Sequence, residues 1–397
     1  MASTMVKGVA LGDSGTSAPD PWGNPHDYRY GSLGPNVDPP YQPTPPGPST
    51  ASRYVDTGTP WVRFWINLDK FFPYNGGVDN ARFAAFERQV KMAKDNGLAV
   101  IATMWNCPTW ASGGGDNTWQ VGALPTYRYP NDVSTTSIWA SMVTCLLTAY
   151  SAGSSTPRYP GAVIDVLEVV NEGNGMMWPQ TDRSGVRTAG CQAAQMMQTA
   201  LVISSWFGNQ ATAIAGPATQ DLRWSSSNGH NASPSNLSAI NQTDAVVFSS
   251  DVARVFRSAG FIPGTRAVFT THNHDDIVYQ HFTVGEIRET SLRGEQWAGW
   301  PYADPNRPHL WITEGGAKTE YLLSLGIPPA NVENWRALLI KVAFLRMKND
   351  STSASSGGYG IDLMMYYQWE TSGFDCGLCE ALPSRAPRPA YGTWKGL

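Results

Sequence analysis

The sequence has no long apolar run. Hydrophobic residues make up 42% of its 397 residues, yet no stretch of eighteen or more is predominantly apolar. A helix that crosses a bilayer needs about 20 such residues. We therefore expect a chain that buries a large core and has no membrane partner.

Charge is also scarce. Charged residues make up only 15% of the chain, and 28 Lys and Arg against 32 Asp and Glu give a net charge of -4. Proteins that bind nucleic acid carry a surplus of basic residues. The charge balance gives no reason to expect nucleic acid as a partner.

Cysteine is rare, and an export signal is missing. Five cysteines form no regular framework; Cys376 and Cys379 have the spacing of half a zinc site, without the second pair that such a site needs. We expect a local disulfide or two free thiols there. The first eleven residues hold no long apolar stretch behind basic ones. A secreted or extracytoplasmic protein that has lost its signal is expected, with a cytoplasmic one as the alternative; the sequence does not indicate the oligomeric state.

What the chain does contain is an alternation of short apolar, β-branched runs with longer segments of helical period. This pattern is typical of a parallel α/β fold. Eight runs are the number that a closed barrel needs, so we predict a single (β/α)8 TIM barrel over residues 1–397. The predicted strands are 6–11, 61–68, 99–106, 163–172, 212–216, 266–270, 309–314 and 361–369.

The connections add detail to this barrel. Phe83, Phe86, Val90 and Ala93 predict a helix that ends at Gly97, and Trp335, Leu338, Val342 and Leu345 repeat the same spacing. Asp244 is a candidate N-cap for a helix to Ser258, and 389–397 can form a short closing helix. A long proline-rich connection at about 13–54 follows the first strand and is expected to wall the catalytic face.

Two of the predicted strands end in glutamate. The fourth ends Val-Val-Asn-Glu at Glu172, and the seventh ends Trp-Ile-Thr-Glu at Glu314. Active sites of such barrels lie at the C-terminal ends of the strands, and strands four and seven stand nearly opposite each other. Retaining glycoside hydrolysis needs two carboxyl groups roughly 5 to 5.5 Å apart. Glu172 and Glu314 are therefore the candidate catalytic pair.

These motifs resemble clan A of the glycoside hydrolases over nearly the whole chain. The resemblance implies that Asn171 holds the sugar 2-hydroxyl, Glu172 is the acid/base and Glu314 is the nucleophile. It also implies that Arg63, in Trp-Val-Arg-Phe-Trp on strand two, lies near the nucleophile. Further substrate-binding positions implied by it are Trp105, Asn106, Trp110, His272, His274 and Trp369.

Two positions depart from the pattern of the clan. The usual Asn-Glu-Pro is Asn-Glu-Gly here, with Gly173, and the tyrosine position after strand six carries His274. Neither departure removes a carboxylate, but both bear on the family. The segment 214–218 and the strand-six histidine resemble family 39, whereas the ends of strands two and three suit family 5 equally well.

The resulting hypothesis is a retaining glycosidase that cleaves O-glycosidic bonds of an oligo- or polysaccharide without a metal or organic cofactor. The mechanism needs a raised pKa at Glu172, which apolar contact could provide, and a lowered pKa at Glu314, which the charge of Arg63 could provide. Exo action is slightly favoured because the first loop could block the cleft. Two alternatives stay open: a carbohydrate-binding barrel without turnover, and a metal-dependent isomerase or deacetylase that uses His272, His274 and Asp275.

Overall fold

Eight parallel strands close into a barrel. In chain order they are β1 (Val6–Ala10), β2 (Trp61–Asn67), β3 (Ala99–Trp105), β5 (Val166–Glu168), β7 (Ala213–Ala215), β8 (Ala267–His272), β9 (Leu310–Glu314) and β10 (Ile361–Tyr367). Each pairs with the next, and β1 pairs with both β2 and β10, which closes the ring. The prediction of a single (β/α)8 TIM barrel is confirmed.

The computed structural model describes residues 5–10, 57–106, 108–112, 123–124, 138–175, 178, 181–182, 188–208, 212–219, 243, 245–258, 267–278, 310–350, 361–367, 375–378 and 386–397. The long connection at about 13–54, Asp244, Trp369 and Cys379 lie outside these ranges. Predictions that concern them stay predictions.

Two differences from the predicted strand boundaries bear on the site. The fourth strand ends at Glu168, so Glu172 lies four residues beyond it and not at its end. The sixth strand continues to His272, two residues past its predicted end. Both differences lie at the C-terminal mouth of the barrel, where the chain leaves the ladder after Glu168 and β8 extends the ladder to His272.

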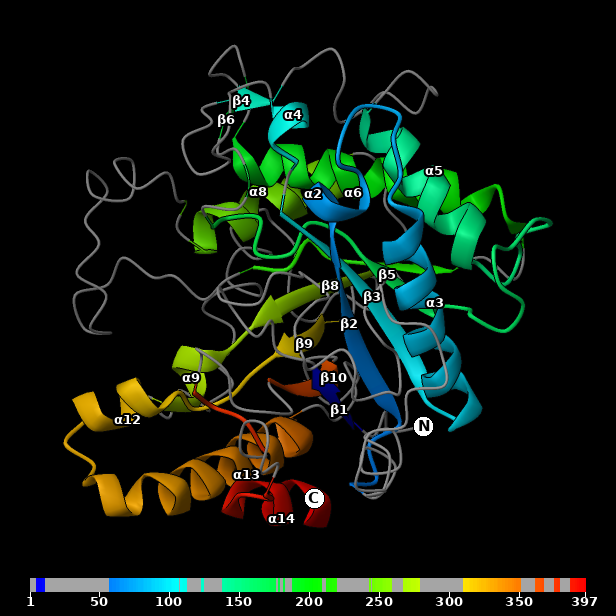
Figure 1. Cartoon of the computed structure of the whole chain (residues 1–397). Coiled ribbons are helices and arrows are strands. Elements are labelled where there is room, and N and C mark those ends of the chain that lie inside the picture. The colour runs from blue at the N-terminus through cyan, green and yellow to red at the C-terminus, as the bar shows by residue number, and fades with distance from the viewer. Residues whose placement is uncertain are drawn as a thin grey trace.

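Helices surround the barrel (Figure 1). They are α2 (Leu68–Phe71), α3 (Asn80–Asp95), α4 (Thr109–Ser112), α5 (Ile138–Tyr150), α6 (Ala189–Ser205), α8 (Ala245–Ser258), α9 (His274–Val278), α12 (Thr319–Ser324), the 3-10 turn η6 (Pro329–Asn331), α13 (Val332–Asp350) and α14 (Pro389–Gly396). A two-stranded sheet joins β4 (Ala123–Leu124) to β6 (Thr181–Asp182). Among the described residues, no helix is long and apolar enough to cross a membrane.

The ends of α3 show how local sequence sets a helix. The carboxylate of Asp79 accepts hydrogen bonds from the backbone N–H groups of Ala81 and Arg82, which caps the N-terminus. At the other end Gly97 has a φ of +75°, and the N–H of Leu98 returns to the carbonyl of Ala93. A left-handed residue with such a bond is the usual helix stop, so the prediction for Gly97 is confirmed.

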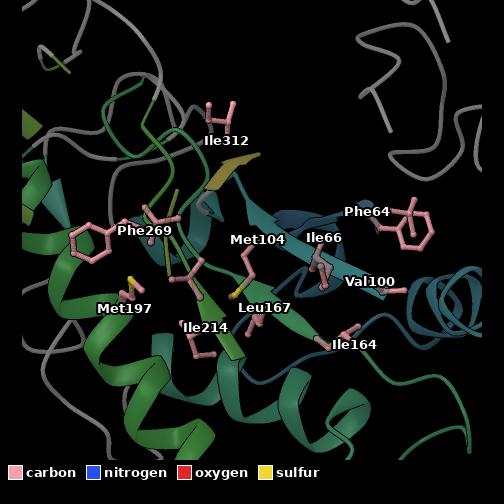
Figure 2. Packing of buried hydrophobic residues seen from close by; sticks show 14 of the residues in the cluster. Phe64, Ile66, Val100, Met104, Ile164, Leu167, Met197, Ile214, Phe269 and Ile312 are labelled. Carbon is pink, nitrogen blue, oxygen red and sulfur yellow. The ribbon is translucent and has the colours of Figure 1, made fainter. Parts of the chain in front are cut away.

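Two apolar layers hold the barrel and its helices together. Figure 2 shows the larger one, where outward side chains such as Ile66 on β2, Met104 on β3 and Leu167 on β5 pack beneath the helices. The smaller one fills the barrel interior with Ile101, Val166, Ala215, Leu363 and Met365. Gly8 permits this filling, since a Cβ there would lie 2.8 Å from the Met365 side chain.

Helix α13 forms where it was predicted, but with a different buried face. Trp335, Leu338 and Leu345 are 36%, 48% and 40% exposed, so the apolar spacing that indicated the helix does not mark its core side. The side facing the barrel includes Ile340, Phe344 and the fully buried Arg336. The guanidinium of Arg336 donates to the carbonyl oxygen of Ala317. Because this hydrogen bond offsets the cost of burying the charge, Arg336 can occupy a buried position of the helix, where an apolar residue would be expected.

Candidate active site

Glu314 is the last residue of β9 and is almost fully buried. Two glycines follow it. A Cβ at Gly315 would lie 2.1 Å from Oδ1 of Asn273, and one at Gly316 would lie 2.3 Å from the carbonyl oxygen of Tyr367. The chain after Glu314 therefore passes so close to β10 and to the end of β8 that only glycine fits, and this fixes where the carboxylate points.

Glu172 reaches the same mouth by a different route. After β5 ends, Val170 and Glu172 both have positive φ values, +57° and +50°. Such values are uncommon for residues with side chains and rare for β-branched ones, and they recur at functional sites. Between them, the N–H of Asn171 donates to the carbonyl of Met104 at the end of β3. The turn places Asn171 and Glu172 over the barrel opening.

The two glutamates meet there, together with one histidine. A carboxylate oxygen of Glu172, one of Glu314 and a ring nitrogen of His272 lie within 4.8 Å of one another. Nδ1 of His272 is 3.0 Å from Oε1 of Glu172, while Nε2 is 3.5 Å from Oε1 of Glu314 and has no hydrogen-bond partner. The imidazole thus bridges two carboxylates that come from opposite sides of the barrel.

Arg63 is the charged centre beneath this pair. Its guanidinium, on β2, is fully buried, and each of its three nitrogens donates to a different residue. Nη1 lies 2.6 Å from Oε1 of Glu314, Nη2 lies 2.7 Å from Oδ1 of Asn171, and Nε lies 2.7 Å from Oε2 of Glu168. It also stacks on the ring of Trp65, 4.5 Å from the centroid.

These charges control the ionisation of Glu314. Burial by itself would raise the pKa of this carboxyl group, but His272 and Arg63 oppose burial and lower the pKa to about 2. His274 also lowers the pKa of Glu314. Its Nε2 lies 3.7 Å from Oε2 of Glu314, a distance that is too long for a hydrogen bond but short enough for an ion pair. Glu314 is therefore an anion at neutral pH.

A third carboxylate at this site, that of Glu168, is fully buried and was missed by the sequence reasoning. It ends β5 and accepts hydrogen bonds from the hydroxyl groups of Thr103 on β3 and Thr313 on β9, both 2.7 Å long. Burial raises its pKa, but Arg63 and His272 outweigh burial, and the net pKa is lowered. One signal was available: in the predicted fourth strand, alternation turns both Val166 and Glu168 into the barrel.

His274 begins α9, in the position where the clan usually has tyrosine. Its Nδ1 is 3.0 Å from the carbonyl oxygen of Gly316. A carbonyl only accepts, so Nδ1 carries a proton, and Nε2 can offer a second one toward Glu314 only as an imidazolium. The ring also lies edge-on to Tyr367, with centroids 5.7 Å apart.

The predicted aromatic positions are spread more widely. Trp105 lies edge-on to Trp65, with centroids 5.5 Å apart, and its Nε1 is buried without a partner. The side chain of Asn106 donates to Asn67 at 3.3 Å. Trp110 donates to the carbonyl of Phe72 and lines a hollow between α5 and the segment 72–78 that follows α2. Neither Glu172 nor Glu314 lines that hollow. The structure brings Arg63, Asn171, His272 and His274 to Glu314, and it places Trp110 elsewhere.

Gly173 has a local reason for replacing the usual proline. Its N–H donates to the carbonyl oxygen of Ala218 at 3.0 Å, and a proline would lack this donor. A Cβ at the same place would lie 2.7 Å from the ring of Phe248. The departure from Asn-Glu-Pro therefore follows from tight packing between the turn and α8.

The donor atoms at the mouth fit a metal ion poorly. Glu172, His272 and Glu314 are three residue types that bind divalent cations. However, the Glu314 oxygen nearest to His272 already accepts from Arg63 at 2.6 Å. A cation bound there would lie beside a buried guanidinium, and the two positive charges would repel each other. The side chain of Asp275, the third ligand of the metal alternative, lies outside the described residues.

A TIM barrel with carboxylates from its fourth and seventh strands at the C-terminal mouth is the architecture of clan A glycoside hydrolases, and the chain resembles that clan. No protein-family model and no curated protein matches the chain. Solved structures do match it, and those described below have low sequence identity.

Three of these structures span nearly the whole chain. A family 5, subfamily 18 glycoside hydrolase from Bifidobacterium longum subsp. longum has a TM-score of 0.58 at 14% identity and covers 99% of this chain and 78% of its own. The exo-β-1,4-mannosidase of Opitutaceae bacterium strain TAV5 has a TM-score of 0.55 at 10% identity, covering 99% and 58%. A family 39 glycoside hydrolase from Bacteroides cellulosilyticus WH2 has a TM-score of 0.51 at 11% identity, covering 99% and 64%.

These likenesses bear on the fold. At identities of 10% to 14%, they establish the barrel fold, and the chemistry has to be argued from the residues of the site. The chain also spans less than two thirds of the length of two of the three neighbours. Both family 5 and family 39 are represented, as the sequence resemblance implied.

Proposed function

We propose that the chain is a retaining glycoside hydrolase, with one catalytic domain over residues 1–397, that cleaves O-glycosidic bonds through Glu172 and Glu314. The observation that carries the proposal is the separation of the two carboxylates, which have oxygens within 4.8 Å of each other. Retaining enzymes space these groups by about 5 to 5.5 Å, whereas inverting enzymes leave about 6.5 to 9.5 Å for a water molecule. The spacing supports direct attack by a carboxylate.

In the first step Glu314 attacks the anomeric carbon. Arg63 occupies Oε1 of Glu314, so Oε2 is the oxygen left for attack. Glu172 protonates the departing oxygen at the same time, and the sugar remains bonded to Glu314. Asn171 accepts from Arg63 through Oδ1, which leaves its amide NH2 to donate to the sugar 2-hydroxyl.

In the second step Glu172 acts as a base. It takes a proton from a water molecule, and the resulting hydroxide attacks the anomeric carbon and releases Glu314. Nδ1 of His272 lies 3.0 Å from Glu172 and can hold the carboxylate in place while its protonation changes. Two displacements at one carbon return the original anomeric configuration.

The proposed substrate is an oligo- or polysaccharide, cleaved from a chain end. One fold neighbour is an exo-β-1,4-mannosidase, and a variant of the Bifidobacterium enzyme was solved in complex with Manβ1-4GlcNAc. Both favour short saccharides in this arrangement of strands. Release of single sugars or short units at all times of digestion supports exo action, whereas a rapid fall in polymer length contradicts it.

A panel of aryl glycosides tests the proposal. At least one glycoside should be cleaved by the wild-type chain, and Glu172→Gln and Glu314→Gln should each lower its turnover by several orders of magnitude. Glu320→Gln is the matched control, since the Glu320 side chain is 72% exposed on α12. Full activity in either active-site variant would sink the assignment.

Two other functions compete with this one. A metal-dependent isomerase or deacetylase predicts metal in the purified protein and activity that a chelator abolishes. A carbohydrate-binding barrel predicts saccharide binding without turnover in the same panel. We further propose a secreted or extracytoplasmic location, which recovery of the mature chain from culture medium would test.

A further inference from the structure

Arg63 connects the two groups that the reaction depends on. Through Nη1 it holds the nucleophile Glu314, and through Nη2 it holds Asn171, the proposed ligand of the 2-hydroxyl. Its third nitrogen, Nε, takes no part in either contact and donates to Glu168. The orientation of one guanidinium plane therefore sets the position of both groups.

That orientation is not the one that an arginine beside a single carboxylate adopts. Arginine and carboxylate prefer two parallel N–H···O bonds, which tie up both carboxylate oxygens. In this site the contact between Arg63 and Glu314 joins Nη1 to Oε1, and Oε2 is left facing His274 at 3.7 Å. Something must keep the guanidinium from turning toward Glu314.

Glu168 is itself held firmly enough to do so. Its side chain is fully buried, and Oε2 accepts from both Arg63 and Thr103 while Oε1 accepts from Thr313. The contacts other than that of Arg63 come from β3 and β9, so two strands fix the carboxylate independently of the arginine. A group held in this way cannot follow the arginine if the arginine turns.

We propose that Glu168 is a positioning residue: by holding Nε of Arg63, it restricts Arg63 to one contact with Glu314, which frees Oε2 for attack and aligns Asn171 with the sugar 2-hydroxyl. The inference rests on the proposed glycosidase function. It assigns Glu168 no contact with substrate, because the carboxylate lies beneath Arg63 and has no exposed surface.

The kinetic test compares wild type and a Glu168 variant on two substrates, a glycoside and its 2-deoxy analogue. For Glu168→Leu, we expect kcat/KM on a cleaved aryl glycoside to fall by about 100-fold, since misplacement of reacting groups by about 1 Å has effects of that size. The rate penalty for the matching 2-deoxy glycoside should shrink, because Asn171 is displaced together with Glu314. A purely structural role would slow both substrates equally and leave the penalty unchanged, and that result overturns the proposal.

Conservative variants guard against a protein that fails to fold. In Glu168→Gln the amide oxygen can still accept from Arg63 and Thr103, and the hydroxyl of Thr313 can turn to accept from the amide NH2. Activity should recover to within about 10-fold of the wild type if positioning is what matters. Thr313→Val removes one of the bonds that fix Glu168 and should shrink the 2-deoxy penalty as well.

Thr270→Val is the matched control for Thr313→Val. Thr270 is a buried threonine on β8 whose hydroxyl has no hydrogen-bond partner among the described residues, so its loss should leave the hydrolysis of both substrates unaffected. Equal effects of Thr313→Val and Thr270→Val on the penalty would contradict the proposal.

A structural measurement separates this inference from the proposed function. If no glycoside is cleaved, the function fails, and crystal structures of the wild-type and Glu168→Leu proteins, or Thr313→Val if that variant fails to fold, then decide the positioning role alone. The expected result is a guanidinium that turns to hold both oxygens of Glu314 and releases Asn171. An Arg63 that keeps both contacts in the variant overturns the inference.

Discussion

The two proposed catalytic glutamates reach the same mouth in contrasting surroundings. Glu314 ends a strand, its side chain is 5% exposed, and Arg63 and two histidines surround it. Glu172 lies four residues beyond its strand on a turn with positive φ, its side chain is 15% exposed, and among the described side chains its one polar contact is His272. Glu314 is a buried carboxylate held by a cation, whereas Glu172 lies on a turn at the rim of the barrel.

This difference matches two chemical tasks. A nucleophile must stay ionised and must not move, which the buried guanidinium of Arg63 and a strand end provide for Glu314. An acid/base must give and take a proton while it faces water, so a fixed cation beside it would work against its protonated form. The contact of Arg63 with Glu314 therefore supports the proposed roles independently of strand order.

Replacing each of the two glutamates by alanine should have the largest effect and should distinguish their roles. Glu314→Ala and Glu172→Ala should both lower turnover by several orders of magnitude, but azide should rescue them with different products. Azide in place of Glu314 attacks once and gives the inverted glycosyl azide, and azide replacing water in Glu172→Ala gives the retained one. NMR gives the configuration of each azide product. A retained azide from Glu314→Ala and an inverted azide from Glu172→Ala would contradict the proposed roles.

Arg63→Lys should affect the Glu314 side. Lysine keeps the charge but cannot bond Glu168, Glu314 and Asn171 in one plane. We expect kcat to fall by about 100-fold, in the range seen when one fixed donor is lost. Arg158→Lys is the control, since Arg158 also contacts two side chains, Glu87 and Asn80, but far from the mouth. Equal activities of the two variants would show that the planar guanidinium is dispensable.

Acid should lower the stability of the folded protein through protonation of Glu314. The pKa of Glu314 is about 2 in the folded protein, below the value of about 4.3 in an unfolded chain. Its contribution to stability, of the order of 3 kcal/mol, is therefore full above about pH 4.5 and lost as the pH falls toward 2. Glu168, whose pKa is also lowered, adds a loss of the same sign. Urea unfolding of wild type and Glu314→Gln across this range should give a shallower pH dependence in the variant, and parallel curves would contradict the lowered pKa.

The smallest expected effect lies on the Glu172 side, at Gly173. Gly173→Ala keeps the N–H bond to Ala218 but places a Cβ against Phe248, so we expect a loss of about 1 to 3 kcal/mol. Gly173→Pro loses the bond as well and should be less stable still. Thermal unfolding measures both, and a Gly173→Pro protein as stable as Gly173→Ala would show that the bond to Ala218 is unimportant.

Much of this site was predictable, and the rest failed for identifiable reasons. The eight strands and the catalytic pair came from apolar runs that end in polar residues. The position of Glu172 beyond β5 was missed because the largely apolar run goes on through Val169 and Val170, although the backbone has already left the strand there. Glu168 was missed because one glutamate inside such a run reads as an exposed interruption until its partners on β2, β3 and β9 are known.

The stereochemistry of the first product tests the central claim most directly. Proton NMR of an aryl glycoside during early hydrolysis reports the anomeric configuration before mutarotation. Attack by Glu314 followed by water predicts a product with the configuration of the substrate. An inverted first product would contradict the account, since it would require a water molecule between two carboxylates whose oxygens lie within 4.8 Å of each other.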